Sequence, residues 1–355
     1  MSNIFHPTEE EFKDFVKYIE HIENKMCILL QEYIIPPPYW SPRPSKKSRT
    51  YHDVDKYMIE GPIKEQVEMI AKGVFIKNNV EFKTQMSVKQ FRKTISSKKF
   101  RKPNNINLCN IESVFWDNLI NNETLYGSDT PGSFFDKDVK EFNINNLGTI
   151  LDILMEKKNR ANIFEGVNTP YLYFGAFKSI FTWHIEDMDL YSINYLHFGE
   201  PKFWYAIPTK FSDSFEKMAS TFFPEESKNC NAFLRHKKFI FSPEVLKANN
   251  IQYETVIQNP GEFIITFPKA YHMGFNMGYN CAEAINFALE RWIDFGKNVV
   301  HCYCKEMVDF SMLPFLQRFR PNEYKNWLQN ELSKNNINNG KNYFKRKSRG
   351  KVRKF

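Results

Sequence analysis

The sequence predicts a mixed α+β fold in which helices flank a double-sheet β-barrel. Two observations favour this class: short aromatic and β-branched runs recur in the second half of the chain, and runs with helical spacing lie before and after them. With 355 residues, of which 42% are apolar, the chain is long enough to bury one large core or two modest ones.

The predicted helices lie mainly outside the barrel. Thr8 and Glu11 have the spacing of a capping box, and apolar residues then recur at helical spacing as far as Ile22. The prolines within 34–40 end this helix, and the polar stretch 41–50 predicts an exposed linker. Further helices are expected at 87–95, 111–119, 143–156 and 309–332.

The predicted strands are short and separated by Gly, Pro and Asn. Antiparallel strands of this kind that carry a metal site favour a jelly roll of the cupin type, with the site inside the barrel mouth. The strands are expected at 171–174, 192–198, 203–207, 263–267 and 282–289.

One of these extended runs leads into a candidate metal site. His184 and Glu186 are two residues apart, so on an extended backbone both side chains leave the same face. His272 follows another strand-like run and offers a third ligand. Two histidines and one carboxylate leave open positions on a metal, as in non-haem Fe(II) oxygenases. Two alternatives stay open: a hydrolytic zinc site, which uses the same ligand types, and hydrogen-bonded core histidines.

The six cysteines are too unevenly spaced for a disulfide scaffold. Two short pairs, Cys230 with His236 and Cys302 with Cys304, have spacings compatible with a closed tetrahedral zinc site. The other three are expected to be buried small hydrophobic residues; they are Cys27, Cys109 and Cys281.

The formal net charge is +8, and part of the excess is local. Residues 345–354 contain seven basic side chains and no acidic one. Such a tail is either a solvated end or a contact for nuclear import or nucleic acid. Neither a membrane-spanning run nor a signal pattern is found in the sequence, which favours the cytosol or the nucleus.

Several ordered motifs carry a family resemblance. The chain resembles the JmjN/JmjC lysine demethylases, and most closely their histone H3 trimethyl-lysine branch. The likeness runs from Phe5 to about Tyr324, and its motifs are His6-Pro-Thr-Glu-Glu-Glu-Phe12, Ile35-Pro-Pro-Pro-Tyr-Trp40, Tyr126-Gly-Ser-Asp129, Glu165-Gly-Val-Asn-Thr-Pro-Tyr171, His184-Ile-Glu186, Gly199-Glu-Pro-Lys202, Ala232-Phe-Leu-Arg-His236 and Tyr271-His272.

The resemblance implies a domain order and a fold. It implies a JmjN segment at 5–46, a mixed region at 47–137 that packs on the barrel, and a JmjC catalytic barrel at 138–304. A helical segment at 305–335 would complete the zinc-stapled region, and 336–355 would be a basic, disordered tail. The implied fold is a double-stranded β-helix, the jelly-roll or cupin-like barrel.

The resemblance also implies roles for individual residues. His184, Glu186 and His272 would hold Fe(II), and Cys230, His236, Cys302 and Cys304 a structural Zn(II). The co-substrate 2-oxoglutarate would be held by Lys202, Tyr126 and Asn194 between the walls formed by Phe181 and Trp204. The methyl-lysine pocket and its entrance would comprise Asp129, Glu165, Gly166, Tyr171, Tyr173, Lys237, Ala284, Ile285 and Asn286.

The activity implied by the resemblance is oxidative demethylation. An Fe(II)- and 2-oxoglutarate-dependent dioxygenase would hydroxylate the N-methyl groups of tri- and dimethyl-lysine on the histone H3 tail and release formaldehyde. Lysine 9 is favoured over lysine 36 because Ala284-Ile285 stands where other members have Ser-Thr. The expected protein is a nuclear monomer that contacts nucleosomes and, through its basic tail, DNA. The alternatives are a JmjC protein hydroxylase and a non-catalytic chromatin-binding module.

Overall fold

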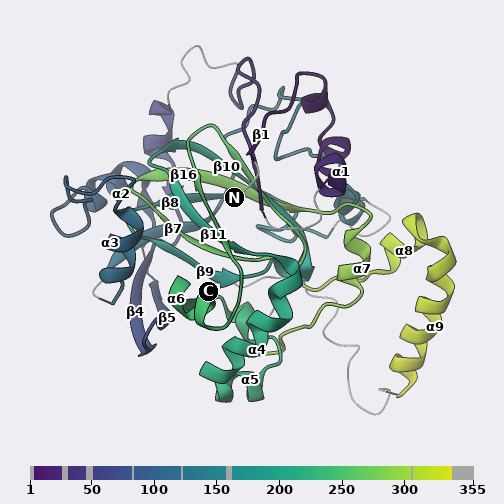
Figure 1. Cartoon of the computed structure of the whole chain (residues 1–355). Helices are drawn as coiled ribbons and strands as arrows, with labels where there is room; N and C mark the ends of the chain where they lie inside the picture. Colours follow the sequence, from purple (N-terminus) through teal and green to yellow (C-terminus); the bar gives the residue numbers. More distant parts are fainter. Residues whose placement is uncertain are drawn as a thin grey trace.

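The computed structural model describes residues 4–25, 31–44, 51–81, 84–120, 123–156, 162–304 and 307–337. Two facing sheets form a barrel at the centre of the molecule, and helices lie around it (Figure 1). The predicted fold class, a jelly-roll barrel with flanking helices, is therefore confirmed.

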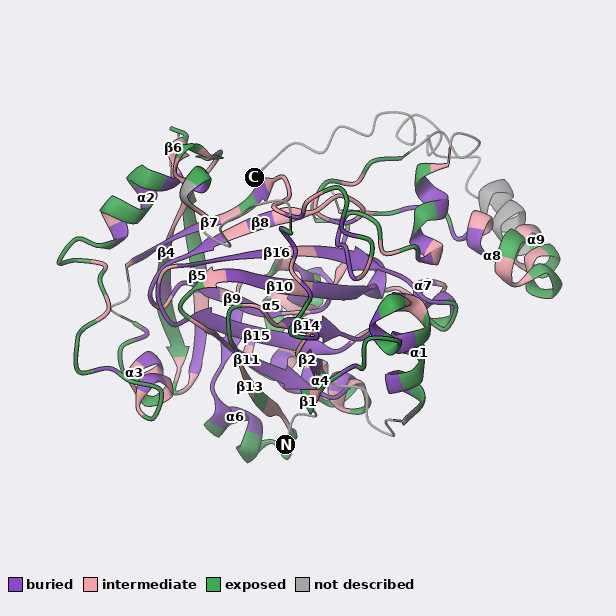
Figure 2. Cartoon of the chain, turned by 90° about the horizontal axis from the view of Figure 1, so that it is seen from above, coloured by how far each residue is buried: buried purple, intermediate pink, exposed green. Residues whose placement is uncertain are grey.

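The larger sheet has ten strands, and its neighbours are antiparallel except for the pair β1 and β2. Figure 2 shows that its central strands are buried, because the second sheet covers one face and helices and loops cover the other. In spatial order the strands are β1 (Ile4–Phe5), β2 (Gln31–Ile34), β14 (Phe263–Thr266), β10 (Tyr191–Gly199), β16 (Asn280–Phe287), β8 (Tyr171–Gly175), β7 (Thr124–Pro131), β4 (Ile63–Ala71), β5 (Val74–Glu81) and β12 (Phe239–Phe241).

The smaller sheet has four strands and carries most of the candidate site. Its order is β13 (Glu254–Gln258), β11 (Lys202–Ile207), β15 (Tyr271–Asn276) and β9 (Ile180–His184). A separate two-stranded sheet pairs β3 (Met58–Ile59) with β6 (Met86–Ser87).

Helices lie outside the barrel, and α9 projects from its side (Figure 1). In the part of the chain that the structure describes, none of them is both long and apolar enough to cross a membrane. The α-helices are α1 (Phe15–Lys25), α2 (Val88–Ile95), α3 (Ile111–Asp117), α4 (Ser212–Phe222), α5 (Pro224–Asn229), α6 (Pro243–Ala248), α7 (Trp292–Gly296), α8 (Leu313–Phe319) and α9 (Pro321–Ile337). The 3-10 helices are η1 (Glu11–Lys13), η2 (His52–Lys56), η3 (Ile150–Met155), η5 (Asp187–Asp189), η6 (Thr209–Phe211) and η7 (Phe233–His236).

The N-terminal segment packs directly on the barrel. Phe12 stacks on Phe142 with ring centroids 4.0 Å apart, and Trp40 packs against Phe263 of β14. The indole of Trp40 also donates a hydrogen bond to the backbone oxygen of Glu141 at 3.0 Å. The segment therefore covers the outer face of the larger sheet and shares its apolar core.

Most predicted elements are present, but two helices differ from the prediction. Thr8 and Glu11 make the reciprocal contacts of a capping box, as predicted. These contacts lie at the start of the short η1 and not of α1, because extended backbone at Asp14 separates the two helices. The helix predicted over 143–156 was wrong for its first half, because helical structure begins only at η3.

Two other predictions were incomplete or wrong. The mixed region contains β4 and β5, which the sequence did not indicate because their outer faces are polar and exposed. Cys109 is exposed where a buried residue was expected, while Cys281 is buried as predicted. The linker residues 45–50, Cys27 and the basic tail lie outside the described residues.

Candidate metal centre

Three potential metal ligands meet at the mouth of the barrel. His184 ends β9 and pairs in register with His272 of β15, so their rings lie side by side with centroids 4.2 Å apart. Glu186 follows β9, and its Oε1 is 3.4 Å from Nε2 of His272. One ligand atom from each residue lies within 4.8 Å of the other two, close enough for all three to bind one ion.

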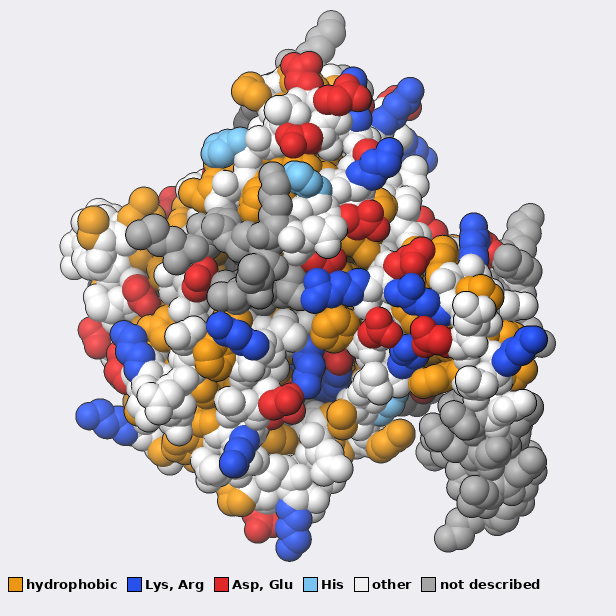
Figure 3. Space-filling model, turned by 45° about the vertical axis from the view of Figure 1, so that its right-hand side comes forward, with side chains coloured by type: hydrophobic (Ala, Val, Ile, Leu, Met, Phe, Trp, Pro, Cys, Tyr) orange, Lys and Arg blue, Asp and Glu red, His pale blue; other side chains and the backbone are white. Residues whose placement is uncertain are grey.

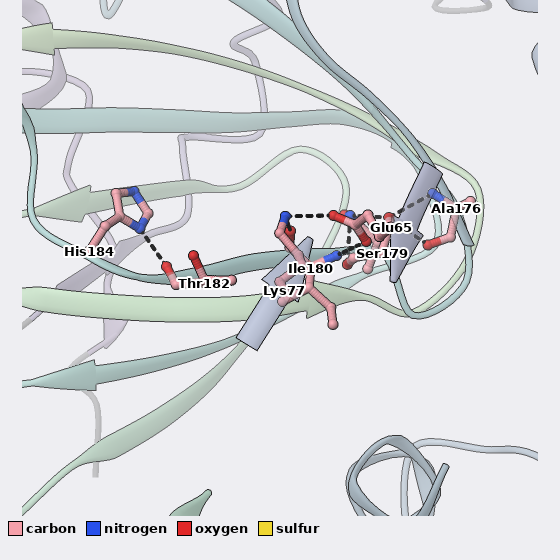
Figure 4. A network of polar contacts seen from close by, with 8 residues as sticks. Glu65, Lys77, Ala176, Ser179, Ile180, Thr182 and His184 are labelled. Carbon is pink, nitrogen blue, oxygen red and sulfur yellow. Dashed lines mark hydrogen bonds and ion pairs between the residues drawn. The ribbon is translucent and has the colours of Figure 1, made fainter. Parts of the chain in front are cut away.

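The two imidazole rings are oriented by backbone carbonyl groups. Nδ1 of His184 is 2.7 Å from the oxygen of Thr182, and Nδ1 of His272 is 3.1 Å from the oxygen of Ala270; Figure 4 draws the first of these contacts. Because a carbonyl oxygen can only accept, each Nδ1 donates. Each Nε2 is then the nitrogen left to face the cluster, and it binds a metal in its unprotonated form.

An arginine fixes the loop that carries Glu186. Nη1 of Arg235 donates to the backbone oxygen of Glu186 at 3.1 Å, and the same guanidinium forms a buried ion pair with Asp189. Met188 and Asp189 have the left-handed φ values of 55° and 49°; the ion pair with Arg235 holds the side chain of Asp189, and the indole of Trp292 donates to the backbone oxygen of Met188 at 2.8 Å. Sequence analysis gave Arg235 no role, although this residue stands in the motif Ala232-Phe-Leu-Arg-His236.

The charges at this site suit a cation. Burial, followed by the neighbouring His272 and Lys237, lowers the pKa of His184 well below its ordinary value of 6.5. Burial alone would raise the pKa of Glu186, but the hydrogen bond and charge of His272 outweigh it and lower that pKa below 4.5. At neutral pH the site therefore offers a neutral imidazole and a carboxylate.

Lys202 lies deeper in the same barrel and is 1% exposed. Its Nζ donates to Oδ1 of Asn276 at 2.7 Å and lies 5.8 Å from the ring centre of Tyr126. Burial lowers the pKa of Lys202 from 10.5 to about 7. Among the described residues no carboxylate forms an ion pair with it, so this lysine favours an anionic ligand.

Two aromatic side chains wall the space beside Lys202. Phe181 and Trp204 meet edge to face with ring centroids 4.5 Å apart, and Nζ of Lys202 is 5.5 Å from the centre of the Phe181 ring. Gly274 lies between them in the sheet, and a Cβ there would come within 2.4 Å of Phe181. Glycine is thus needed for the close approach of the walls.

Gln258 connects the wall to the opposite sheet. The indole of Trp204 donates to Oε1 of Gln258 at 3.0 Å, and Nε2 of Gln258 is 3.2 Å from Oδ1 of Asn194. This fully buried glutamine orients both predicted residues. Sequence analysis did not find it, because a glutamine at a strand end has no distinctive pattern.

The predicted methyl-lysine pocket lies mainly on the larger sheet. Asn194, Ala284 and Tyr171 are direct cross-strand neighbours on β10, β16 and β8, so their side chains share one face. The hydroxyl of Tyr171 donates to Glu165 at 3.2 Å. Gly166 has φ of 75°, and a Cβ there would meet the Tyr171 ring at 2.6 Å.

The other predicted pocket residues are placed less uniformly. Tyr173 lies near Tyr126, with ring centroids 6.4 Å apart, and Nδ2 of Asn286 donates to the backbone oxygen of Tyr191 at 3.0 Å. Ile285 occupies the opposite face of β16 and packs in the core under the N-terminal segment. The side chain of Ile285 is therefore not brought together with those of Ala284 and Asn286.

Asp129 and Lys237 are both held in left-handed conformations, with φ of 54° and 53°. Nζ of Lys237 is 3.8 Å from Oδ2 of Asp187, beside the loop that follows the metal ligands. The charges of Asp187, Glu186 and Asp129 raise the pKa of Lys237 against the effect of burial, with Asp187 contributing most.

A second ligand cluster lies outside the barrel. Cys230 follows α5, His236 ends η7, and Cys302 and Cys304 follow α7. One ligand atom from each of the four lies within 4.8 Å of the others, and Sγ of Cys302 is 3.3 Å from Nε2 of His236. Four sulfur and nitrogen ligands at this separation can hold a tetrahedral zinc ion.

Comparisons with known proteins agree with this architecture. Residues 171–287 match the model of the JmjC domain, hydroxylase, and residues 3–27 match that of the jmjN domain. The chain is 46% identical over 327 residues to lysine-specific demethylase 4B of Mus musculus, covering 92% of the chain and 29% of that protein. It is 45% identical over 326 residues to lysine-specific demethylase 4D of Rattus norvegicus, covering 91% of the chain and 62% of that protein.

The chain spans less than two thirds of the length of these relatives. The JmjC match includes β9 and β15 with His184, Glu186 and His272, and the jmjN match includes α1, which packs on the barrel. Both domains and the similarity over nine tenths of the sequence show that the chain belongs to the JmjN/JmjC-domain lysine demethylase family.

Proposed function

We propose that this chain is an Fe(II)- and 2-oxoglutarate-dependent dioxygenase that demethylates tri- and dimethyl-lysine on the histone H3 tail. One observation supports the proposal most: a set of two histidines and one carboxylate opens into the same barrel as a buried lysine without a carboxylate partner among the described residues. The first feature suits a metal with open positions, and the second suits an anionic co-substrate.

His184, Glu186 and His272 would hold the iron. Their donor set fits Fe(II), since both Nε2 atoms face the cluster and the carboxylate reduces the net charge of the bound ion. When bound, iron with 2-oxoglutarate and O2 supplies the oxidising power for hydroxylation of an N-methyl group, after which formaldehyde is released. The protein's own part is to orient the reactants and exclude water.

Lys202 would bind the far carboxylate of 2-oxoglutarate, because its ammonium group is buried and has donors to spare. Tyr126 and Asn194 would add hydrogen bonds, and Phe181 and Trp204 would confine the carbon chain between them. A hydrolytic zinc enzyme would have no use for such a lysine, which is why we prefer the dioxygenase.

The methyl-lysine would enter between Tyr173, Glu186 and the row of side chains on the larger sheet. A trimethylated ammonium has no N–H to donate, so oxygen atoms and aromatic faces are the suitable contacts. Gly166, Ala284 and Asn286 would line the pocket, with Glu165 and Tyr171 beside it and Asp129 and Lys237 at its entrance. Ile285 would contribute only through its backbone, because its side chain lies in the core.

We assign Cys230, His236, Cys302 and Cys304 to a structural zinc ion. Burial, together with Cys302 and Cys304, raises the pKa of the Cys230 thiol to about 12. A dication at this point would stabilise the thiolates and join α5 and η7 to the segment after α7.

The proposed partners are the H3 tail and the nucleosome, bound by a nuclear monomer. Figure 3 shows that basic and acidic side chains are interspersed on the face that it presents, so this face offers no field of a single sign. The seven basic residues of 345–354, which lie outside the described residues, are the segment to which we assign non-specific DNA contact.

A panel of H3 peptides tests the proposal. The purified chain, supplied with Fe(II), 2-oxoglutarate and O2, should release formaldehyde from peptides trimethylated or dimethylated at lysine 9, and less from lysine 36. Peptide oxygenation without formaldehyde would indicate a protein hydroxylase instead. Neither product, with the peptides nonetheless bound, would indicate a non-catalytic chromatin-binding module.

A further inference from the structure

We infer that Asn276 is a positioning residue that aims the ammonium group of Lys202 at the far carboxylate of the co-substrate. The inference rests on the proposed function, because it concerns the 2-oxoglutarate subsite. Asn276 is fully buried on β15 and lies directly opposite Lys202 of β11 in the sheet register. Its Oδ1 accepts a hydrogen bond from Nζ of Lys202 at 2.7 Å.

The neighbours of Asn276 permit only one orientation of its amide. Nδ2 is 3.3 Å from the backbone oxygen of Ser179 and 2.8 Å from its hydroxyl. The backbone oxygen cannot donate, so the NH2 group must face Ser179. Oδ1 then faces Lys202, and it also accepts from Nδ2 of Asn280 at 3.0 Å.

A neutral acceptor orients the lysine without satisfying its charge. A carboxylate at this position would form an internal ion pair and compete with the co-substrate. The amide oxygen engages one of the three ammonium hydrogens, which leaves two for an anion in the barrel. The lysine is therefore held in one direction and still favours an anionic ligand.

The residue after Ser179, the partner of Asn276, is fixed by a buried ion pair. Nζ of Lys77 donates to Oε1 of Glu65 at 2.7 Å and to the backbone oxygen of Ile180 at 2.8 Å. Oε2 of Glu65 accepts from the backbone N–H of Ile180 at 2.9 Å, so both polar groups of that peptide backbone are held (Figure 4). Ser179, the preceding residue, also bonds through its hydroxyl to both backbone groups of Ala176.

The same contacts bring strands β4 and β5 into the subsite. Glu65 and Lys77 are on these strands, and Ile180 is the first residue of β9, which ends at His184. The contacts thus run from Glu65 and Lys77 to the backbone of Ile180, along the chain to Ser179, and from Ser179 to Asn276 and Lys202. Each bond is buried, so water does not compete with it.

Two keto acids separate a positioning role from a merely structural one. 2-Oxoglutarate carries the far carboxylate, and 2-oxobutyrate offers the same metal-binding keto acid without it. Calorimetry measures the binding of each keto acid to the full chain. The chain is loaded with Mn(II) in place of iron, so that both compounds can bind without turnover. In Asn276→Ala, affinity for 2-oxoglutarate should fall about 10-fold or more, as expected for a displaced charge-assisted hydrogen bond, while affinity for 2-oxobutyrate should stay within about twofold.

Asn280→Ala is the matched control. Asn280 is also a fully buried asparagine, and it contacts the same Oδ1, but within the described part of the chain it makes no hydrogen bond to Lys202. Asn280→Ala should therefore weaken the binding of both keto acids to the same small extent. If Asn276→Ala does not fold, Asn276→Ser is the second variant. The serine side chain places a hydroxyl beside Ser179 but is too short to reach Nζ of Lys202, so the same selective loss of affinity for 2-oxoglutarate is expected.

A double variant tests whether Asn276 acts through the lysine. Asn276→Ala added to Lys202→Met should cost no further affinity for 2-oxoglutarate, because the group it orients is already absent. Additive losses, or equal losses for both keto acids in Asn276→Ala, would overturn the inference. Failure of the unmodified protein to bind 2-oxoglutarate would instead refute the proposed function itself.

Discussion

The two ligand clusters of this molecule differ in number, setting and neighbours. His184, Glu186 and His272 lie on or just after paired strands of one sheet, and they face the interior of the barrel. The four residues of the Cys/His cluster come from segments far apart in the sequence and join helices outside it. The first set has three ligands with orienting partners, whereas the second has four sulfur and nitrogen ligands.

This difference separates chemistry from stability. Three ligands on one side of an ion leave positions for other molecules, and in the proposed function the buried Lys202 nearby would hold one of them by its charge. Four ligands fill a tetrahedron and leave no such position. The open cluster should therefore control turnover with little effect on folding, and the closed cluster should do the reverse.

The largest expected effect is on turnover at the open cluster. Glu186→Ala removes one of three ligands, so demethylation should fall by more than about 100-fold, measured as formaldehyde released from a trimethylated H3 peptide. Zinc content and the thermal unfolding midpoint should match those of the unmodified protein. If activity stayed near the original rate, Glu186 would not be a metal ligand.

The closed cluster should respond in the opposite sense. Cys302→Ser should lower the zinc content from about one ion per chain and reduce the unfolding midpoint by more than about 5 °C, because zinc binding contributes directly to folding. Metal analysis and thermal unfolding measure the two effects. A protein that contained iron but no zinc before mutation would contradict the assignment.

A pH titration sharpens the contrast between the clusters. Burial lowers the pKa of Lys202 to about 7, and only its protonated form attracts a carboxylate. Affinity for 2-oxoglutarate should thus be greatest below pH 7 and fall above it, by at most about 10-fold per pH unit, until the pKa of the complex is reached. Calorimetry with Mn(II)-loaded protein measures this, and 2-oxobutyrate, which lacks the far carboxylate, should show no such fall.

The residues proposed to touch a ligand could be predicted from sequence better than those proposed to orient them. His184, Glu186, His272 and Lys202 stand in long motifs, and the barrel strands show aromatic and β-branched runs. Asn276 and Gln258 make contacts with residues distant in sequence, which no local pattern records, and the motif that contains Arg235 did not indicate its contact with Glu186. The ion pair of Glu65 and Lys77 could not be predicted for the same reason. It is buried, but its two residues stand among other charged residues, and the sequence does not distinguish them from exposed ones.

Errors in the predicted fold have local causes. The spacing of Leu147, Ile150 and Leu154 predicted one helix over 143–156. Only the second half of this range is helical, and it forms a 3-10 helix that packs against the core. Ile285 was grouped with Ala284 because the resemblance places the pair where other members have Ser-Thr. Adjacent residues of a strand point to opposite faces, so this grouping failed for the side chain.

The smallest expected effect is on the preference between trimethyl- and dimethyl-lysine, and it concerns the open cluster alone. Ala284 is a cross-strand neighbour of Asn194 and Tyr171, where a hydroxyl group would join the polar lining of the proposed pocket. Ala284→Ser should change the ratio of trimethyl to dimethyl turnover by about two- to fivefold, the range of one net hydrogen bond. Rates on the two lysine 9 peptides measure the ratio, while zinc content serves as the control. An unchanged ratio would show that position 284 does not contact the methyl groups, and the preference would then have to come from Tyr173 or Asn286.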